Sequence, residues 1–283
     1  MQRSQLRGTC VPEISIRFSG DEVAAGEAYL VETPVLRLHA GRQPDLFLRW
    51  NAVPVAATAI DVIVHLHGFS QQRGDMLLSE KVPRSGLDLS GRIRPTLALL
   101  PRGNWIRHTY YDFPGLLDGG LDRLVAYSVE RFAEAIGQRS MAVERLILTA
   151  HSGGGMPALD ATAGATRPPD ELQIFDGLYG RDPSLGDPMQ GLEAIDRWLG
   201  KRLAGEPARP GGLRIIYIER QTGPFSRAAG DLIARRLAPV EPGLEAELAR
   251  RYRVEPSGVP HGYIALIAGP QLLADTAAEI DWR

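Results

Sequence analysis

Hydrophobic residues gather in short, bounded runs along the chain, and these runs predict the strands of a sheet. Such runs are typical of a parallel sheet covered on both faces, because neither face of a strand then needs polar residues. Five segments have this character: 61–66, 96–100, 146–149, 172–175 and 213–218. We expect them to form a parallel core.

Helices are predicted between these runs, where apolar residues recur at three- and four-residue spacing. The clearest case is 121–136, whose stripe consists of Leu121, Leu124, Val125, Val129, Phe132 and Ile136. The other predicted helices are 156–163, 192–203, 226–237 and a closing helix at 272–280. The alternation of strand and helix predicts an α/β fold, with a mostly parallel central sheet flanked by helices.

The N-terminal part, 11–50, has a different pattern. Segments 14–18 and 46–50 alternate with a period of two, which is typical of antiparallel strands, and we expect them at the edge of the sheet. No internal repeat or low-complexity linker divides the chain. We therefore predict a single domain over 1–283, with its core at 61–282.

Composition narrows the class of protein. The formal net charge is −2 and the arginines are scattered, which argues against a nucleic-acid partner. Cys10 is the only cysteine, so an intrachain disulfide is excluded. No apolar run approaches the roughly 20 residues that span a bilayer, and residues 1–10 lack the apolar core of a signal peptide. We predict a cytoplasmic protein without a membrane span, and leave signal-independent export open.

The strand at 146–149 ends in a turn made mostly of small residues. Residues 150–154 follow the pattern G-x-S-x-G, with Ala150 in place of the first glycine. A sharp strand-to-helix turn needs small residues because the serine backbone is strained and the helix packs close to the strand. Such a turn exposes the hydroxyl at its tip, so Ser152 is predicted to be a nucleophile. His151 is expected to pack or to form a hydrogen bond.

A second turn, His67-Gly68-Phe69-Ser70, closes the strand at 61–66. A nucleophilic serine requires donors for the oxyanion that forms on the attacked carbonyl, and preorganised backbone N–H groups suit this best. One donor is normally the residue after the nucleophile, here Gly153, and the other lies in the turn after an earlier strand. We predict the amides of Phe69 and Gly153, with Ser70 as the alternative to Phe69.

The base and the acid are expected after Ser152 in the chain. Of the six histidines, only His261 follows the last predicted core strand and precedes the closing helix, so a loop can bring it to the serine. Two carboxylates, Asp176 and Glu219, end the intervening strands. We favour Asp176, because a strand tip followed by glycine is where site residues of open α/β sheets lie. Glu219, beside Arg220, remains the alternative acid.

Together, the serine turn, the His-Gly turn and the late histidine resemble the α/β-hydrolase fold superfamily, over about 61–282. The resemblance implies Ser152 as nucleophile, His261 as base and an oxyanion hole formed by two backbone amides, without a cofactor.

The acid departs from the common pattern of that superfamily. Many members carry it in a turn after the strand that corresponds to 213–218. Here residues 220–224 are Arg-Gln-Thr-Gly-Pro, without an aspartate. This departure shifts the assignment toward Asp176, a position that a minority of the superfamily uses.

Aromatic residues near the same end of the sheet are candidates for substrate binding. Segment 103–114 supplies Trp105, Tyr110 and Tyr111, and Tyr179 follows the strand at 172–175. Aromatic rings with polar tips line ligand pockets well, and they equally pin loops to a core. The largest excursion, 181–212, is expected to cover the site in part.

Two other kinds of ligand are disfavoured. His65 and His67 lie on one face of a strand, but no cysteine or suitably spaced carboxylate completes a metal site. The glycines at 153–155 precede a helix, but no lysine follows them as a P-loop requires. We predict no metal, cofactor or nucleotide.

The sequence thus predicts a serine hydrolase that cleaves a carboxylic ester through an acyl-enzyme. The substrate is expected to be a small-molecule or peptide acyl compound. Peptidase, amidase or acyltransferase activity would use the same residues and stays open. A non-catalytic binding protein of this fold would need Ser152 or His261 to be missing or displaced.

Overall fold

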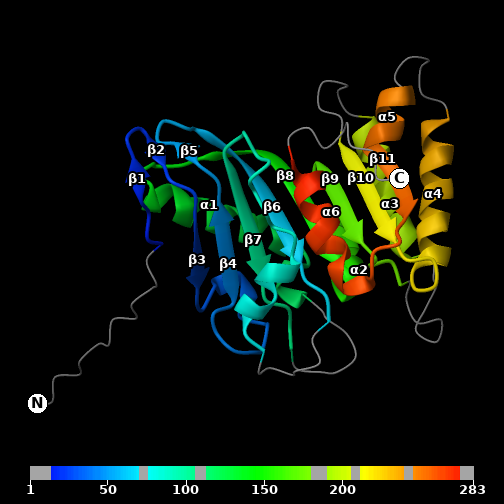
Figure 1. The fold of residues 1–283 in the computed structure, drawn as a ribbon, viewed down its shortest axis with the longest axis horizontal. Helices are drawn as coiled ribbons and strands as arrows, with labels where there is room; N and C mark the ends of the chain where they lie inside the picture. The colour runs from blue at the N-terminus through cyan, green and yellow to red at the C-terminus, as the bar shows by residue number, and fades with distance from the viewer. Residues whose placement is uncertain are drawn as a thin grey trace, which may run out of the picture.

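The structure is a computed structural model that describes residues 14–69, 76–105, 113–179, 190–204, 211–238 and 245–274. An eight-stranded sheet runs through it (Figure 1). In order across the sheet, the strands are β11 (Tyr252–Pro256), β10 (Gly212–Tyr217), β9 (Glu171–Phe175), β8 (Ala142–His151), β6 (Ala59–Leu66), β7 (Thr96–Pro101), β4 (Leu46–Trp50) and β3 (Gly26–Leu30).

The central strands are parallel, as the sequence predicts. β6 pairs in parallel with β7 and β8, and parallel pairing continues through β9, β10 and β11. β4 runs antiparallel to β7, and β3 runs antiparallel to β4. All five predicted core strands belong to this sheet, so the predicted fold class is confirmed.

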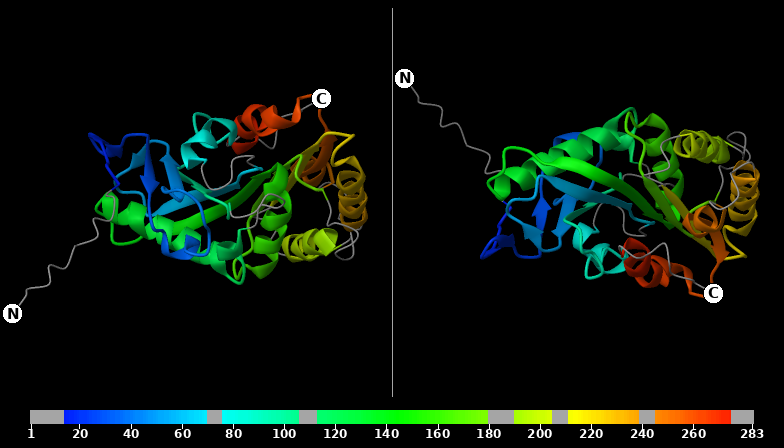
Figure 2. Two further views of the ribbon diagram at one scale, coloured as in Figure 1. Left: turned by 90° about the horizontal axis from the view of Figure 1, so that it is seen from below. Right: turned by 90° about the horizontal axis from the view of Figure 1, so that it is seen from above.

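Helices and short turns cover both faces of the sheet (Figure 2). One face carries α1 (Gly120–Ala135), α2 (Gly155–Gly164), α3 (Gln190–Leu203) and α4 (Gly223–Leu237), which contact one another in this order. The other face carries α6 (Ile264–Leu273) and two 3₁₀ turns, η2 (Leu78–Glu80) and η3 (Val82–Arg84). This double cover explains why every residue of β6 after Ala59 is buried.

The four predicted helices between the core strands correspond to α1, α2, α3 and α4, with small differences at their ends. The predicted closing helix at 272–280 is described only at its start, where it overlaps the end of α6. α6 begins at Ile264 and ends at Leu273, and residues 275–283 lie outside the described residues. The pair Gly269-Pro270 suggests a helix break, but the glycine serves packing, because a Cβ there would lie 2.9 Å from the Gly86 carbonyl oxygen.

The expectation for the N-terminal part is half correct. Segment 46–50 is the antiparallel strand β4, but 14–18 does not join the main sheet. Only its end forms a strand, β1 (Phe18–Ser19), in a small antiparallel sheet with β2 (Glu22–Val23) and β5 (Val53–Pro54). The place beside β4 belongs to β3, whose exposed and half-buried residues give little apolar pattern.

The strand at the opposite edge, β11, and the helix before it, α5 (Glu245–Arg251), are absent from the elements that the sequence predicts. β11 contains the charged residues Arg253 and Glu255, so it lacks the continuous apolar run by which the other strands were predicted. The structure pairs these two residues with each other, and Glu255 also pairs across to Arg214 on β10 at 3.1 Å. Charged residues at a sheet edge also discourage pairing with other chains.

The excursion at 181–212 contains α3, which packs between α2 and α4 with Trp198 buried. This helix therefore belongs to the layer that covers the sheet, while 181–189 and 205–210 lie outside the described residues. Among the helices that the structure describes, none combines the length and the apolar character needed to cross a bilayer.

Candidate active site

Ser152 lies at the tip of the turn between β8 and α2. Its φ is +53°, in the left-handed region that non-glycine residues rarely occupy. The 3₁₀ turn η5 (Ser152–Gly154) then leads into α2. The turn requires small residues because a Cβ on Gly154 would lie 2.3 Å from the Leu66 carbonyl oxygen at the end of β6. The predicted strained strand-to-helix turn is present.

His261 meets this serine from a distant part of the chain. It begins the 3₁₀ turn η6 (His261–Tyr263), between β11 and α6. Its Nε2 lies 2.8 Å from Ser152 Oγ, which is hydrogen-bond distance. The histidine ring is partly exposed and Ser152 is buried, so solvent reaches the pair from the side of the histidine.

Asp176 completes a chain of hydrogen bonds behind the histidine. Its Oδ2 accepts from His261 Nδ1 at 2.6 Å, and its Oδ1 accepts from the Ile218 backbone N–H at 2.9 Å and from the Thr222 hydroxyl. The residue is fully buried, with φ at +46° directly after β9. Burial raises the pKa of Asp176, but the hydrogen bonds from His261, Thr222 and Ile218 outweigh it and hold the pKa below its usual value.

Glu219, the alternative acid, lies elsewhere. Its side chain is largely exposed and forms an ion pair with Arg227 of α4. In the described part of the chain, the carboxylate that binds His261 Nδ1 is that of Asp176 and not that of Glu219. The structure therefore brings together Ser152, His261 and Asp176 from the ends of three separate segments.

The turn after β6 lies against the serine. A Cβ on Gly68 would fall 2.7 Å from Ser152 Cβ, so only glycine permits this approach. The turn that carries Phe69, one of the two predicted oxyanion donors, therefore lies beside the serine. Gly153, the other predicted donor, follows Ser152 directly. Ser70, the alternative to Phe69, lies outside the described residues.

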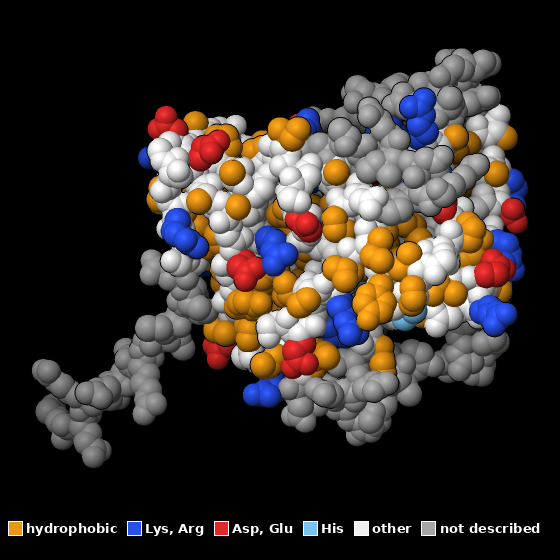
Figure 3. Space-filling model, viewed as in Figure 1, with side chains coloured by type: hydrophobic (Ala, Val, Ile, Leu, Met, Phe, Trp, Pro, Cys, Tyr) orange, Lys and Arg blue, Asp and Glu red, His pale blue; other side chains and the backbone are white. Residues whose placement is uncertain are grey.

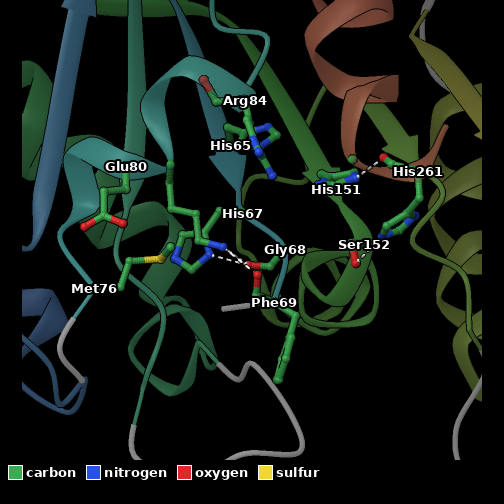
Figure 4. Close-up of a pocket in the computed structure, with 13 residues that line it drawn as sticks. His65, His67, Gly68, Phe69, Met76, Glu80, Arg84, His151, Ser152 and His261 are labelled. Carbon is green, nitrogen blue, oxygen red and sulfur yellow. Dashed lines mark hydrogen bonds between the residues drawn. The ribbon is translucent and has the colours of Figure 1, made fainter. Parts of the chain in front are cut away.

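An open cavity of about 600 Å³ borders Ser152 and His261. Figure 4 shows the two residues at one end, with His67, Gly68 and Phe69 facing them. The opposite wall comes from the segment 76–85, with Met76, Glu80, Lys81 and Arg84. Hydrophobic side chains gather on the outer face over α6 (Figure 3), where Tyr263, Leu266 and Ile267 are exposed. The residues that line the cavity are of mixed character: Phe69 and Met76 are apolar, Lys81 and Arg84 are cationic, and Glu80 is anionic.

Of the four aromatic residues that the sequence suggests for substrate binding, the structure describes Trp105 and Tyr179. Trp105 is buried and packs on the His67 ring, with ring centroids 5.4 Å apart, so it supports the His67–Phe69 turn and does not line the cavity. Tyr179 stands at the site, with its hydroxyl 3.5 Å from Ser152 Oγ and 3.4 Å from His261 Nε2. Tyr110 and Tyr111 lie outside the described residues.

Three further histidines surround the site, and all are held neutral. Burial lowers the pKa of His65 to about 3 and that of His151 to about 4, and it lowers the pKa of His67 well below its usual value. His67 Nε2 accepts from the Gly103 backbone N–H at 2.9 Å, so its Nδ1 carries the proton and donates to Gly68 O at 2.9 Å. Both ring nitrogens of His67 are therefore engaged. Within the described ranges, no group of three or more potential ligand side chains is placed to hold a metal ion.

Some residues of the site escaped the sequence interpretation. Thr222 and the backbone of Ile218 bind Asp176, although the sequence marks this turn only by its missing aspartate. Lys81 donates from Nζ to the carbonyl oxygens of Gly68 and Phe69 at 2.8 and 2.6 Å. The sequence could have drawn attention to Lys81 only because lysine is rare in this chain, where Lys81 and Lys201 are the only two.

Comparisons with known proteins bear on the fold. No protein-family model matches the chain, and no curated protein matches it. Among solved structures, the chain is similar to substrate-bound FphF, a fluorophosphonate-binding serine hydrolase of Staphylococcus aureus, with a TM-score of 0.55 and 10% identity over 91% of this chain and 100% of that one.

Two further structures are similar at lower TM-scores. Siderophore hydrolase EstA from Aspergillus nidulans has a TM-score of 0.45 and 16% identity, over 91% of this chain and 95% of that one. An S-formylglutathione hydrolase from Agrobacterium tumefaciens has a TM-score of 0.44 and 14% identity, over 94% and 98%. The strand order, the strained serine turn and the match to FphF together show that this chain has the α/β-hydrolase fold.

Proposed function

We propose that the protein is a serine hydrolase that cleaves a carboxylic ester through an acyl-enzyme, with Ser152, His261 and Asp176 as its catalytic triad. The observation that carries the proposal is the unbroken chain of hydrogen bonds from Ser152 Oγ through both ring nitrogens of His261 to Asp176 Oδ2. This arrangement matches the roles of nucleophile, base and orienting acid.

In the first step His261 Nε2 takes the proton of Ser152 as Oγ attacks the ester carbonyl carbon. The C=O bond becomes a C–O⁻ bond, and we assign the backbone amides of Phe69 and Gly153 as donors to this oxyanion. The tetrahedral intermediate then collapses. The alcohol leaves with the proton that His261 returns, and the acyl group stays on Ser152.

In the second step a water molecule replaces the alcohol. His261 takes a proton from water, the hydroxyl oxygen attacks the acyl carbon, and Ser152 leaves with the proton as the acid is released. Asp176 remains ionised throughout, in keeping with its lowered pKa, and stabilises the imidazolium that forms twice in each turnover.

The cavity supports a small acyl substrate. Its volume of about 600 Å³ lies within the roughly 300–1,000 Å³ of pockets for small ligands, and it opens to solvent beside His261. A small-molecule ester or a short acylated peptide fits this size. Peptidase, amidase and acyltransferase activity would use the same three residues and are alternatives for the same site.

The test is covalent labelling with a fluorophosphonate probe, together with turnover of 4-nitrophenyl acetate and butyrate. The probe suits this fold because the similar protein FphF is described as fluorophosphonate-binding. We expect the wild type to be labelled and active and Ser152→Ala to be neither. Ser128→Ala, which removes a buried hydroxyl within α1, is the matched control and should still be labelled.

Equal labelling of the wild type and Ser152→Ala would refute the nucleophile assignment. A labelled protein that turns over anilides faster than esters would favour the amidase alternative. Complete absence of labelling and turnover in the folded wild type would favour a non-catalytic binding protein.

A further inference from the structure

Lys81 binds the turn formed by His67, Gly68 and Phe69. It lies between η2 and η3, and its Nζ donates to the carbonyl oxygens of Gly68 and Phe69 at 2.8 and 2.6 Å. The Gly68 carbonyl also accepts from His67 Nδ1 at 2.9 Å, and Figure 4 shows His67, Gly68 and Phe69 clustered in front of Ser152. Two donors thus converge on one carbonyl of this short turn.

The geometry of a single peptide unit makes this contact important. The Gly68 carbonyl and the Phe69 N–H belong to the same planar trans peptide, so they point in opposite directions. Donors that fix the carbonyl on one side therefore fix the direction of the N–H on the other side. This peptide unit lies beside the serine, because a Cβ on Gly68 would lie only 2.7 Å from the Ser152 Cβ.

We propose that Lys81 is a positioning residue of the proposed esterase, which clamps the Gly68–Phe69 peptide so that the Phe69 N–H is aimed at the oxyanion. The proposal rests on the function proposed above. Lys81 acts through the turn and does not touch the reacting atoms.

The surroundings of Lys81 are consistent with this role. Burial and the neighbouring Arg84 lower the pKa of Lys81 to about 8, against the opposite effect of Glu80. The lysine is therefore still mostly protonated at neutral pH, and charged donors form stronger hydrogen bonds to carbonyl oxygens. The charge on Lys81 in turn lowers the pKa of His65, His67 and His151, which helps to keep them neutral.

The test compares Lys81→Met, Lys81→Arg and the wild type with 4-nitrophenyl butyrate. Removing one oxyanion donor outright costs about 10²–10³ in kcat, so a donor that is present but misdirected should cost about 10–100-fold. We expect Lys81→Met to lose that much in kcat with KM within about threefold, and Lys81→Arg, which keeps a charged donor, to recover part of the loss. Lys201→Met, on the exposed side of α3, should behave as the wild type.

A second measurement separates positioning from a merely structural role. A trifluoromethyl ketone forms a tetrahedral adduct with an oxyanion on the nucleophilic serine, so its affinity should fall in Lys81→Met by the same factor as kcat/KM. Folded Lys81→Met with kcat within twofold of the wild type, or with unchanged ketone affinity, would overturn the proposal. If Lys81→Met does not fold, Lys81→Gln replaces it, because its side chain is too short to reach both carbonyls.

The outcomes remain distinct from those of the proposed function. A wild type without esterase activity or Ser152-dependent labelling would contradict the function itself. An active wild type whose folded Lys81 variants are equally active would contradict only the clamp.

Discussion

His151 donates its Nε2 hydrogen to the backbone carbonyl of His261, at 2.9 Å, and the two rings lie 4.8 Å apart. Burial lowers the pKa of His151 to about 4, so the ring is neutral at physiological pH. The residue just before the proposed nucleophile thus anchors the loop that carries the proposed base. The hydrogen bond from His151 to the His261 carbonyl therefore helps to hold Ser152 and His261 together, although it takes no part in the proton transfer between them.

Removing this anchor should slow catalysis without abolishing it. We expect His151→Ala to lower kcat/KM by about fivefold, because a lost hydrogen bond of about 1 kcal/mol frees the His261 loop. His151→Gln, whose amide retains an N–H donor, should recover much of the loss. Steady-state kinetics with a nitrophenyl ester provide the measurement, and equal loss in both variants would show that the hydrogen bond is not the cause.

The choice of acid has a direct test. Asp176→Asn should lower kcat by about 10⁴-fold, because the amide disfavours the histidine tautomer that accepts the serine proton. Glu219→Gln is the matched control, since Glu219 pairs with Arg227 on the surface, and it should stay within about twofold of the wild type. The reverse order of effects would assign the acid role to Glu219.

Tyr179 should affect binding more than chemistry. Its hydroxyl is 3.4 to 3.5 Å from His261 Nε2 and Ser152 Oγ, which is at the limit of hydrogen bonding. We expect Tyr179→Phe to keep kcat within about threefold, and Tyr179→Ala to raise KM because the aromatic ring beside Ser152 and His261 is lost. A loss in kcat of about 100-fold in the phenylalanine variant would instead give the hydroxyl a role in the reaction.

The neutral buried histidines predict a loss of stability in mild acid. An unfolded histidine binds its proton near pH 6.5, whereas burial lowers the pKa of His65 to about 3 and that of His151 to about 4 in the folded protein. Between these values the unfolded state binds more protons, so the free energy of unfolding falls as the pH drops from 6.5 toward 4.

Urea denaturation at several pH values between 7 and 4 would measure this effect, which is about 1.4 kcal/mol for each unit of pKa difference. His65→Gln cannot take up the proton, so its stability should depend less steeply on pH. If the free energy of unfolding of His65→Gln falls with pH as steeply as that of the wild type, His65 does not contribute to the loss of stability.

The serine turn should not tolerate a side chain at Gly154. A Cβ there would lie 2.3 Å from the Leu66 carbonyl oxygen, and we expect Gly154→Ala to cost about 1–3 kcal/mol of stability through overpacking. Gly200→Ala is the opposite control, because Gly200 lies in α3 and a Cβ added there would meet no atom within 4 Å. It should stabilise the protein by about 0.4–1 kcal/mol. Thermal unfolding of the two variants would compare them, and similar shifts would contradict the packing argument.

Much of the fold was accessible from the sequence because its signals are local. The apolar runs that became β6, β7, β8, β9 and β10 lie on strands buried on both faces, so burial left a continuous pattern. The failures have the same origin. β11 carries paired charges and β3 is half exposed, so neither has a strong apolar pattern of its own.

The sequence by itself determined the strained serine turn, because the turn requires small residues close to Ser152 in the chain, and these are visible in the local sequence. Only the tertiary structure decided which groups surround that serine. Asp176 and Glu219 both follow adjacent strands, but the positive φ of Asp176 accompanies its approach to His261, while Glu219 turns to Arg227. Such pairings depend on strand register and on the path of long loops, which local patterns of hydrophobic and polar residues do not record.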